Sequence, residues 1–294
     1  MATSKNSLNW LSFAPVLFVC LWATGFIGSR LSAPYAEPLS FLSVRFAIVA
    51  VLFTAISFAF GAKWPSPRVG LWAIVTGMFT QGGYLGGVFW AIYYGMPAGT
   101  AALITALQPL LTTVLAGVVL GEKTDWRHWT GLLLGLLGVG LVVWPKLSFA
   151  DAGITPITIF MTFMATVSIT VGSIMQKRFL ASIDVRVGNA LQFVGGGLVV
   201  FGAALITEDF NIVWNGDVIF AMVWLVFVLS LGAVSMLFLM IRHGEVSKVS
   251  SLFFLVPAVT AVMAFFLFDE TLGVIQLVGM VVCAGGVLLV TKKP

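Results

Sequence analysis

Four strongly polar side chains interrupt long apolar stretches of this sequence: Arg45, Gln81, Gln108 and Gln192. A glutamine amide has two donor hydrogens and an acceptor oxygen, so in apolar surroundings it needs several partners. An arginine at membrane depth is costly and marks a functional site by default. Arg45 could bind the carboxylate of a substrate, or it could brace its helix by binding helix-end carbonyls. The three amides could line a cavity for a small zwitterionic or weakly polar molecule.

Aromatic residues near these polar groups could supply the walls of such a cavity. Tyr84 ends the run 81–84, in which two glycines leave the backbone bare, and Trp22 and Phe26 lie in the first apolar stretch. Aromatic side chains combine a large apolar surface with specific ring geometry. The same residue types are common in cores and in interfacial belts, so both alternatives stay open for each residue.

The predicted membrane spans contain no acidic residue in their interiors. Every Asp and Glu lies in a predicted loop or at a helix end, and the two histidines, His128 and His243, lie at helix ends. Proton relays within membranes use carboxylates or histidines at membrane depth. If such a chain moves a solute across the membrane, we therefore predict facilitated, gradient-driven movement or exchange, without a carboxylate relay. No metal site, cofactor site, P-loop or set of enzymatic groups is recognisable, which argues against an intramembrane enzyme.

Composition defines the class of protein to which these residues belong. The chain has 294 residues, of which 60% are hydrophobic and 9% charged, with a mean hydropathy of +1.09. Such a composition predicts a polytopic membrane protein surrounded by lipid. The net charge of +4 is small, and no basic cluster with interleaved aromatic residues suggests nucleic-acid binding.

Ten apolar runs are long enough to cross a bilayer, which takes about 20 residues as a helix. The alternation expected of barrel strands is missing, so an all-α fold is predicted. The predicted spans are 10–29, 38–61, 69–92, 98–120, 127–144, 154–176, 187–206, 218–241, 248–268 and 273–291. The first is interpreted as an uncleaved membrane helix, because its apolar run exceeds that of a signal peptide.

An internal repeat organises these spans. A shift of 148 positions superposes Pro109 on Pro257, and it also superposes Thr112 on Thr260, Glu122 on Glu270, Gly131 on Gly279 and Gly138 on Gly286. Fixed-period self-similarity indicates a duplicated unit. We predict two five-helix repeats, 1–146 and 147–294, that together form one transport domain.

Loop charges predict the orientation. With the N-terminus in the cytoplasm, the cytoplasmic segments hold Lys5, Lys63, Arg68, Lys123, Arg127, Lys177, Arg178, Arg186, Arg242, Lys248, Lys292 and Lys293, and the outer segments hold Arg30 and Lys146. The acids Glu37, Asp151, Glu208, Asp209, Asp217, Asp269 and Glu270 fall outside. This asymmetry follows the positive-inside rule and places both termini in the cytoplasm. Because five is odd, the two repeats must then have inverted topology, as in many transporters with a site at the bilayer midplane.

Two prolines and a glycine motif suggest how the helices move and pack. Pro109 and Pro257 each remove a backbone hydrogen bond within a long span, and we predict kinks there that serve as hinges. Gly131 and Gly135 form a GxxxG motif that Gly138 extends. It permits close helix approach, and we favour packing within the bundle over the alternative of a homodimer.

These residues together resemble the drug/metabolite transporter superfamily, in its ten-helix branch with two five-helix repeats. The resemblance lies in Trp22-Ala23-Thr24-Gly25-Phe26, Arg45-Phe46, Pro109, Gly121-Glu122-Lys123, Gly131, Pro257, Glu270, Gly279 and Gly286. The second half of the chain departs from the first at Gln192, which stands near the position where Arg45 would recur. The resemblance implies export of amino acids, including aromatic ones, or of similar metabolites across the bacterial inner membrane. Export of drugs with proton coupling is the alternative, followed by a channel. It also favours the bracing role for Arg45.

Overall fold

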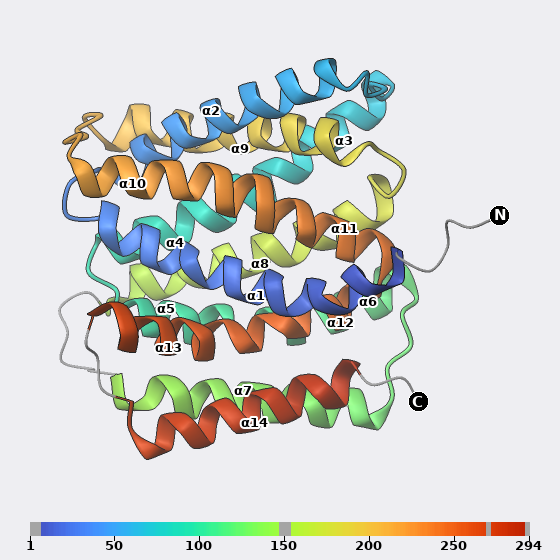
Figure 1. Cartoon of the computed structure of the whole chain (residues 1–294), viewed down its shortest axis with the longest axis vertical. Coiled ribbons are helices and arrows are strands. Elements are labelled where there is room, and N and C mark those ends of the chain that lie inside the picture. Colours follow the sequence, from blue (N-terminus) through green and yellow to red (C-terminus); the bar gives the residue numbers. More distant parts are fainter. Residues whose placement is uncertain (1–6, 147–153, 269–271, 292–294) are drawn as a thin grey trace.

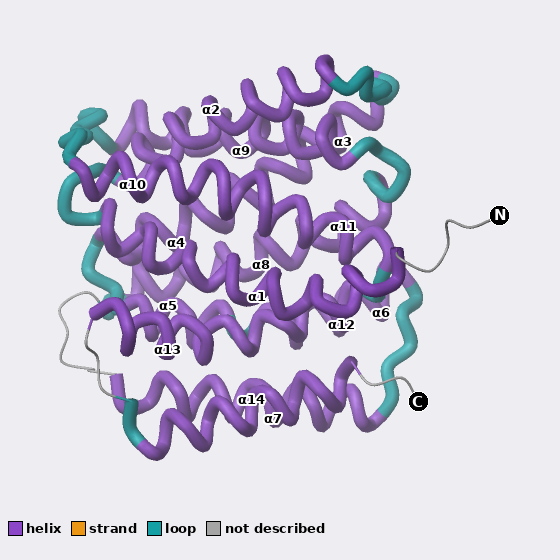
Figure 2. Tube along the Cα trace, viewed as in Figure 1, coloured by secondary structure: helices purple, strands orange, loops and turns teal. Residues whose placement is uncertain are grey.

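The computed structural model describes residues 7–146, 154–268 and 272–291, and this part of the chain is helical, with no strand. The predictions that involve Lys5, Asp151, Asp269, Glu270, Lys292 and Lys293 lie outside the described residues. The helices stand side by side in a bundle, and the loops gather at its two ends (Figure 2). The described parts of α1 and α14 begin and end, respectively, at the same end of the bundle (Figure 1).

The first half of the chain forms five rods, where a rod is one helix or a series of consecutive helical segments that runs from one end of the bundle to the other. Two of the five rods are made of more than one α-helix. Its elements are α1 (Ser7–Ser32), α2 (Pro38–Ala59), α3 (Pro67–Gly77), the π-helical η1 (Met78–Gly83), α4 (Tyr84–Tyr93), α5 (Ala98–Thr105), α6 (Gln108–Leu120), α7 (Trp126–Val143) and the 3-10 turn η2 (Trp144–Lys146). The segments α3, η1 and α4 follow one another without a gap. The segments α5 and α6 are separated by a turn at Ala106 and Leu107.

The second half repeats this order. Its elements are α8 (Pro156–Phe179), α9 (Val185–Thr207), α10 (Gly216–Trp224), the π-helical η3 (Leu225–Val234), α11 (Ser235–His243), α12 (Val246–Ser251), the 3-10 segment η4 (Leu252–Leu255), α13 (Val256–Phe268) and α14 (Val274–Thr291). The bounds of α6 and α7 recur 148 positions later as those of α13 and α14, and both halves carry a π-helical segment in their third rod. The predicted spans agree with the observed rods to within three residues at every end.

Nine of the described helices are long and apolar enough to cross a membrane. The rod Pro67–Tyr93 is not among them, since glycines, Gln81 and Tyr84 lower its hydropathy. It nevertheless packs against α8 and α9 over its length. The chain is therefore an integral membrane protein by composition and by fold.

Counterpart helices from the two halves pack against each other in antiparallel pairs. Gly131 of α7 lies against Gly286 of α14, and Gly138 lies against Gly279, where an added Cβ would come within 2.6–2.7 Å of the partner's carbonyl oxygen. This confirms that the glycine motif packs within the bundle. Likewise α2 and α9 run alongside each other (Figure 1), and the ring of Phe193 contacts those of Phe46 and Phe53.

Candidate functional site

A narrow cavity lies between the two halves, near the middle of the bundle. It has two parts that share Trp22 and Phe26 of α1 and Tyr84 at the start of α4. One part is completed by Ala102, Thr105, Ala106, Gln108, Phe253, Val256 and Pro257, and the other by Gly25, Ser29, Leu85, Val88, Phe89, Ile92, Leu229 and Val234. Both halves of the chain therefore supply its walls.

Interrupted rods bring several of these residues to the cavity. The turn at Ala106 and Leu107 lets α6 start at Gln108, and Pro109 lies in the first turn of α6, where a missing N–H costs little. In the second half, η4 precedes α13, whose second residue is Pro257. The structure thus places both prolines at breaks between helical segments, where the sequence predicted kinks within long helices.

Aromatic rings form the wall around Trp22. Its ring meets that of Phe253 edge-on at 5.2 Å between centroids and lies nearly parallel to that of Tyr84 at 6.5 Å. Phe18 packs behind both Trp22 and Phe253, at 5.3 and 5.5 Å. Such packing holds the rings in defined orientations and presents apolar faces to the cavity.

Gln108 is the polar residue that this wall leaves available. Its side chain is 2% exposed, and its Nε2 atom has no hydrogen-bond partner among the described residues. A buried donor without a partner is costly, by about 1–3 kcal/mol. None of the described residues that line the cavity is acidic. The cavity therefore offers an amide donor and aromatic faces without a fixed negative charge.

The cavity is small and asymmetric in this conformation. Its two parts have volumes of about 10 and 30 Å³, enough for a few water molecules. It extends from Trp22 toward Ser29 and Ile92, near the ends of α1 and α4. A metabolite needs a wider space, so helices must separate before one can bind.

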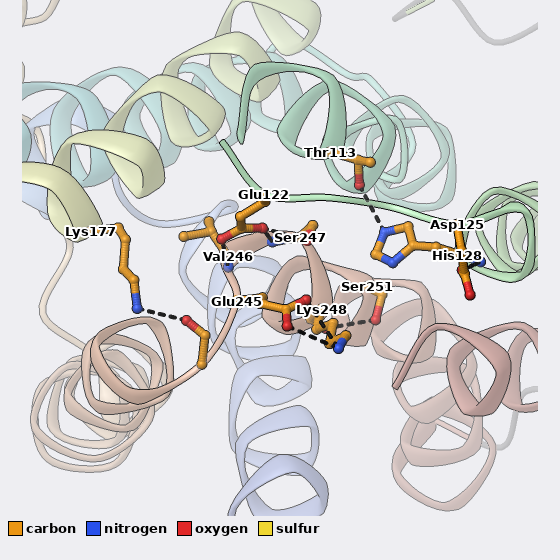
Figure 3. Close-up of polar contacts among 11 residues, drawn as sticks. Thr113, Glu122, Asp125, His128, Lys177, Glu245, Val246, Ser247, Lys248 and Ser251 are labelled. Atoms are coloured by element: carbon orange, nitrogen blue, oxygen red, sulfur yellow. Dashed lines mark hydrogen bonds and ion pairs between the residues drawn. The ribbon is translucent and has the colours of Figure 1, made fainter. Parts of the chain in front are cut away.

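At the opposite end of the bundle, one polar contact joins the two halves and a second joins helices within the second half (Figure 3). Glu122, in the loop after α6, accepts hydrogen bonds at the start of α12: the Val246 N–H donates to Oε1 at 2.7 Å, and the Ser247 N–H and hydroxyl donate to Oε2 at 3.2 and 2.6 Å. A carboxylate at a helix N-terminus satisfies free N–H groups and complements the helix dipole. This contact ties the first half to the second.

A second contact at this end comes from α8 (Figure 3). The ammonium of Lys177 donates to the backbone carbonyls of Arg242 and Gly244 at 3.1 and 2.8 Å, at the end of α11. A cation at a helix C-terminus is favourable for the same electrostatic reason that an anion is at the N-terminus. Lys177 and Glu122 therefore hold the two ends of the short connection between α11 and α12.

Of the seven predicted substrate-binding residues, four line the cavity: Trp22, Phe26, Tyr84 and Gln108. The other three lie elsewhere in the bundle. Arg45 is fully buried against Ser230 of η3, and Gln192 bonds to Gln176 and Thr80. Gln81 packs against the backbone of Gly196 on α9.

The sequence did not single out Phe253. Because 13% of the residues are aromatic, a single phenylalanine does not indicate a binding site by its type alone. The register of the repeat does relate Phe253 to the cavity, because Phe253 stands 148 positions after Thr105 and both residues line the cavity. Gln108 and Val256 are related in the same way, so the register relates cavity residues of the two halves.

A helical membrane bundle made of two like halves, with a narrow cavity between them, has the architecture of a membrane transporter. A sequence profile described as "EamA-like transporter family" matches residues 9–144 and again residues 156–292. The chain belongs to this family of drug/metabolite transporters, and the predicted resemblance is confirmed.

Curated relatives align along nearly the whole chain. A "Probable amino-acid metabolite efflux pump" of Salmonella typhimurium is 27% identical over 287 residues, covering 94% of this chain and 93% of that protein. A protein of the same description from Escherichia coli is 26% identical, covering 93% and 92%. The "Uncharacterized inner membrane transporter YedA" of Escherichia coli is 25% identical, covering 92% and 87%.

A chain of known crystal structure superposes on this one with a TM-score of 0.79 at 20% sequence identity, and the match covers 95% of both chains. At that identity the likeness concerns the fold alone. The family match and the descriptions of the relatives identify a transporter and not an enzyme, as predicted.

Proposed function

We propose that this chain is a ten-span secondary transporter that exports amino acids or related small metabolites across the bacterial inner membrane by alternating access. The family and the names of its relatives support this class of substrate. In this proposal the rod Pro67–Tyr93 is the tenth span, both termini are cytoplasmic, and residues 1–146 and 147–294 form two inverted repeats of one transport domain. Antiparallel packing of counterpart helices supports the inversion.

The observation that carries the proposed site is the buried amide of Gln108 beside the rings of Trp22, Tyr84 and Phe253. An amide donor suits the carboxylate of an amino acid, and aromatic faces suit an apolar side chain or an ammonium group. Aromatic amino acids fit this combination best. Arg45 lies outside the cavity, where it links α2 of the first half to η3 of the second half.

Alternating access requires each end of the bundle to open in turn, including the end that carries Glu122. We infer that the hydrogen bonds of Glu122 and Lys177 break when substrate enters from the cytoplasm, while the breaks before Pro109 and Pro257 act as hinges. Hinges absorb large backbone changes at a few residues where elements meet. The absence of acidic residues from the described cavity wall supports facilitated movement or exchange over a carboxylate relay.

The site is tested by counterflow of labelled amino acids in proteoliposomes. We expect Gln108→Leu to raise the KM for the substrate about tenfold, because it removes a hydrogen bond in a water-poor site. Gln81→Leu is the matched control, since it removes the same amide from a buried position outside the cavity. Its KM should stay within about twofold of the wild-type value, even if expression falls.

Three results would contradict the proposal. A raised KM for Gln81→Leu with an unchanged KM for Gln108→Leu would place the substrate elsewhere. Counterflow of drugs but of no amino acid in the panel would reject the substrate class. Transport that strictly requires a proton gradient would reject the proposed energetics.

A further inference from the structure

A second hollow lies at the end of the bundle that carries Glu122, apart from the cavity. It has a volume of about 600 Å³ and lies between the α2–α3 loop, the α8–α9 loop and the end of α11. Its lining is Gly61, Ala62, Lys63, Trp64, Pro65, Ser66, Val69, Ser182, Ile183, Asp184, Arg186 and Arg242. It shares no residue with the proposed substrate site.

Positive charge dominates this pocket. Three cations, Lys63, Arg186 and Arg242, face one carboxylate, Asp184. That carboxylate is already engaged, because Arg186 donates to it through Nε at 3.0 Å and Nη2 at 2.7 Å. This pairing holds the pKa of the Asp184 carboxyl below its usual value, so the residue stays ionised and bound to Arg186. Two cations are left over.

The two remaining cations have donors to spare. Lys63 is exposed and makes no hydrogen bond or ion pair with any described residue. Arg242 donates one long bond, from Nη1 to the Ile183 carbonyl at 3.4 Å. A guanidinium has five N–H donors in a planar fork that matches the oxygens of a phosphate. Lys63 and Arg242 thus present unused positive charge to the same space.

The helix ends at the pocket differ in a way that also favours an anion. Asp184 caps the start of α9 by accepting the N–H of Arg186 at 2.9 Å. Ser66, at the equivalent place before α3, makes no side-chain capping bond. Pro67, the first residue of α3, has no N–H, so the N–H groups of Arg68 and Val69 are the first of this helix, and they lack a side-chain acceptor beside the pocket. Such groups attract anions.

The surroundings of the pocket fit lipid. Phe58 and Phe60 are 68% and 72% exposed, and Trp64 is 41% exposed. The rings of Phe58 and Trp64 lie 5.3 Å apart, and the Arg186 guanidinium lies 5.5 Å from the centre of the Phe60 ring. Aromatic residues beside cations are typical of the level of lipid headgroups, and basic pockets between membrane helices bind anionic headgroups.

We propose that this pocket binds the phosphate group of an anionic phospholipid, through Lys63, Arg242, the hydroxyl of Ser66 and the start of α3. A soluble phosphate ester would present the same phosphate group to these residues. The exposed aromatic rings, which would contact acyl chains, favour the lipid as its source. The inference concerns a surface separate from the transport cavity and does not depend on the identity of the substrate.

Native mass spectrometry of the delipidated full chain in detergent tests this proposal. The ligands are phosphatidylglycerol and phosphatidylcholine with identical acyl chains, together with glycerol phosphate as the soluble arm. We expect phosphatidylglycerol to bind best. Lys63→Gln should weaken that binding about fivefold, as expected for one cation near a lipid surface. Ser182→Trp, which fills the pocket without changing its charge, should weaken it as well.

Lys123→Gln is the matched control, because Lys123 is an exposed lysine in a loop at the same end but outside the pocket. It should leave phosphatidylglycerol binding within about twofold. Equal effects of Lys63→Gln and Lys123→Gln, or none from either, would overturn the site. Tight glycerol phosphate binding that depends on Lys63, without preference for phosphatidylglycerol, would overturn the lipid as its source.

Discussion

Two buried polar contacts occupy equivalent places in the two halves of the bundle. In each, a helix that packs along its own counterpart meets the π-helical segment of the other half. The guanidinium joint consists of Arg45 on α2 and Ser230 on η3. The amide joint consists of Gln192 on α9, Thr80 on η1 and Gln176 on α8. The same architecture thus carries a charge in one half and a neutral amide in the other.

The amide joint is complete in this conformation. The Gln192 Nε2 donates to Gln176 Oε1 at 2.9 Å, and the Thr80 hydroxyl shares its one hydrogen between the Thr76 carbonyl at 3.0 Å and Gln192 Oε1 at 3.3 Å. Close backbone contact surrounds it, since a Cβ added to Gly77 or Gly195 would lie 2.0 Å from a carbonyl oxygen of the facing helix. Satisfied polar groups in a tightly packed interface make a rigid connection.

The guanidinium joint is incomplete. Arg45 Nη2 and Nε donate to the single hydroxyl of Ser230, at 2.9 and 3.3 Å, and Nη1 has no partner. No carboxylate of the described residues pairs with this fully buried charge. A buried charge with so few partners is expensive. The comparison teaches that one joint holds the halves together, whereas we expect the other to change partners as the transporter changes state.

The largest effect should come from removing the charge at the guanidinium joint. Arg45→Met fills similar space, and Ser230 keeps its hydrogen bond to the Leu225 carbonyl. We expect this variant to raise the free energy of unfolding by about 1–4 kcal/mol, because an uncompensated buried charge is gone. Denaturant titration in micelles measures the change, and counterflow shows whether transport needs the charge.

Arg45→Lys controls for this experiment, since it keeps the charge but loses the planar donors. It should be no more stable than the wild type. If Arg45→Met instead lowered the free energy of unfolding, the guanidinium would be a net stabilising brace in this conformation, and the contrast between the joints would disappear.

Removing the amide of Gln192 should lower the free energy of unfolding, whereas removing the charge of Arg45 should raise it. Gln192→Leu leaves Gln176 Oε1 buried without the donor that it now has. We expect the free energy of unfolding to fall by about 1–2 kcal/mol, the scale of an unmet buried acceptor in a membrane protein. The same titration measures it. A Gln192→Leu variant as stable as the wild type would mean that the two joints do not differ in how well their polar groups are satisfied.

Much of the fold could be predicted from composition and the repeat alone. Apolar runs are long because lipid excludes unsatisfied backbone groups, and the proline at 109 recurs at 257 in one register with its neighbours. The π-helical segments η1 and η3 were not predictable. Gly82 of η1 packs against Val199 and Ser230 of η3 binds Arg45, and no local pattern of residue types encodes these contacts between neighbouring helices.

The candidate site was only partly predictable, and the glutamines show why. Gln108 and Gln192 look alike in sequence, each an amide inside an apolar run. The first has an unpartnered donor at the cavity, whereas the second bonds to Gln176 and Thr80. The two glutamines differ in the helix that packs against them. The residue type therefore predicted that a polar group would be buried, but not which group would bond to it.

The smallest effect should come from trimming the amide joint at its long hydrogen bond. Thr80→Val keeps the shape of the side chain and removes the hydroxyl that lies 3.3 Å from Gln192 Oε1. We expect a loss of about 0.6 kcal/mol in the free energy of unfolding, the average for such bonds between membrane helices. Thr76→Val is the matched control, because the buried Thr76 hydroxyl bonds only to the Trp72 carbonyl of its own helix. Equal losses in both variants would show that the hydroxyl of Thr80 contributes nothing across the interface, and that the amide joint rests on Gln176 and close packing alone.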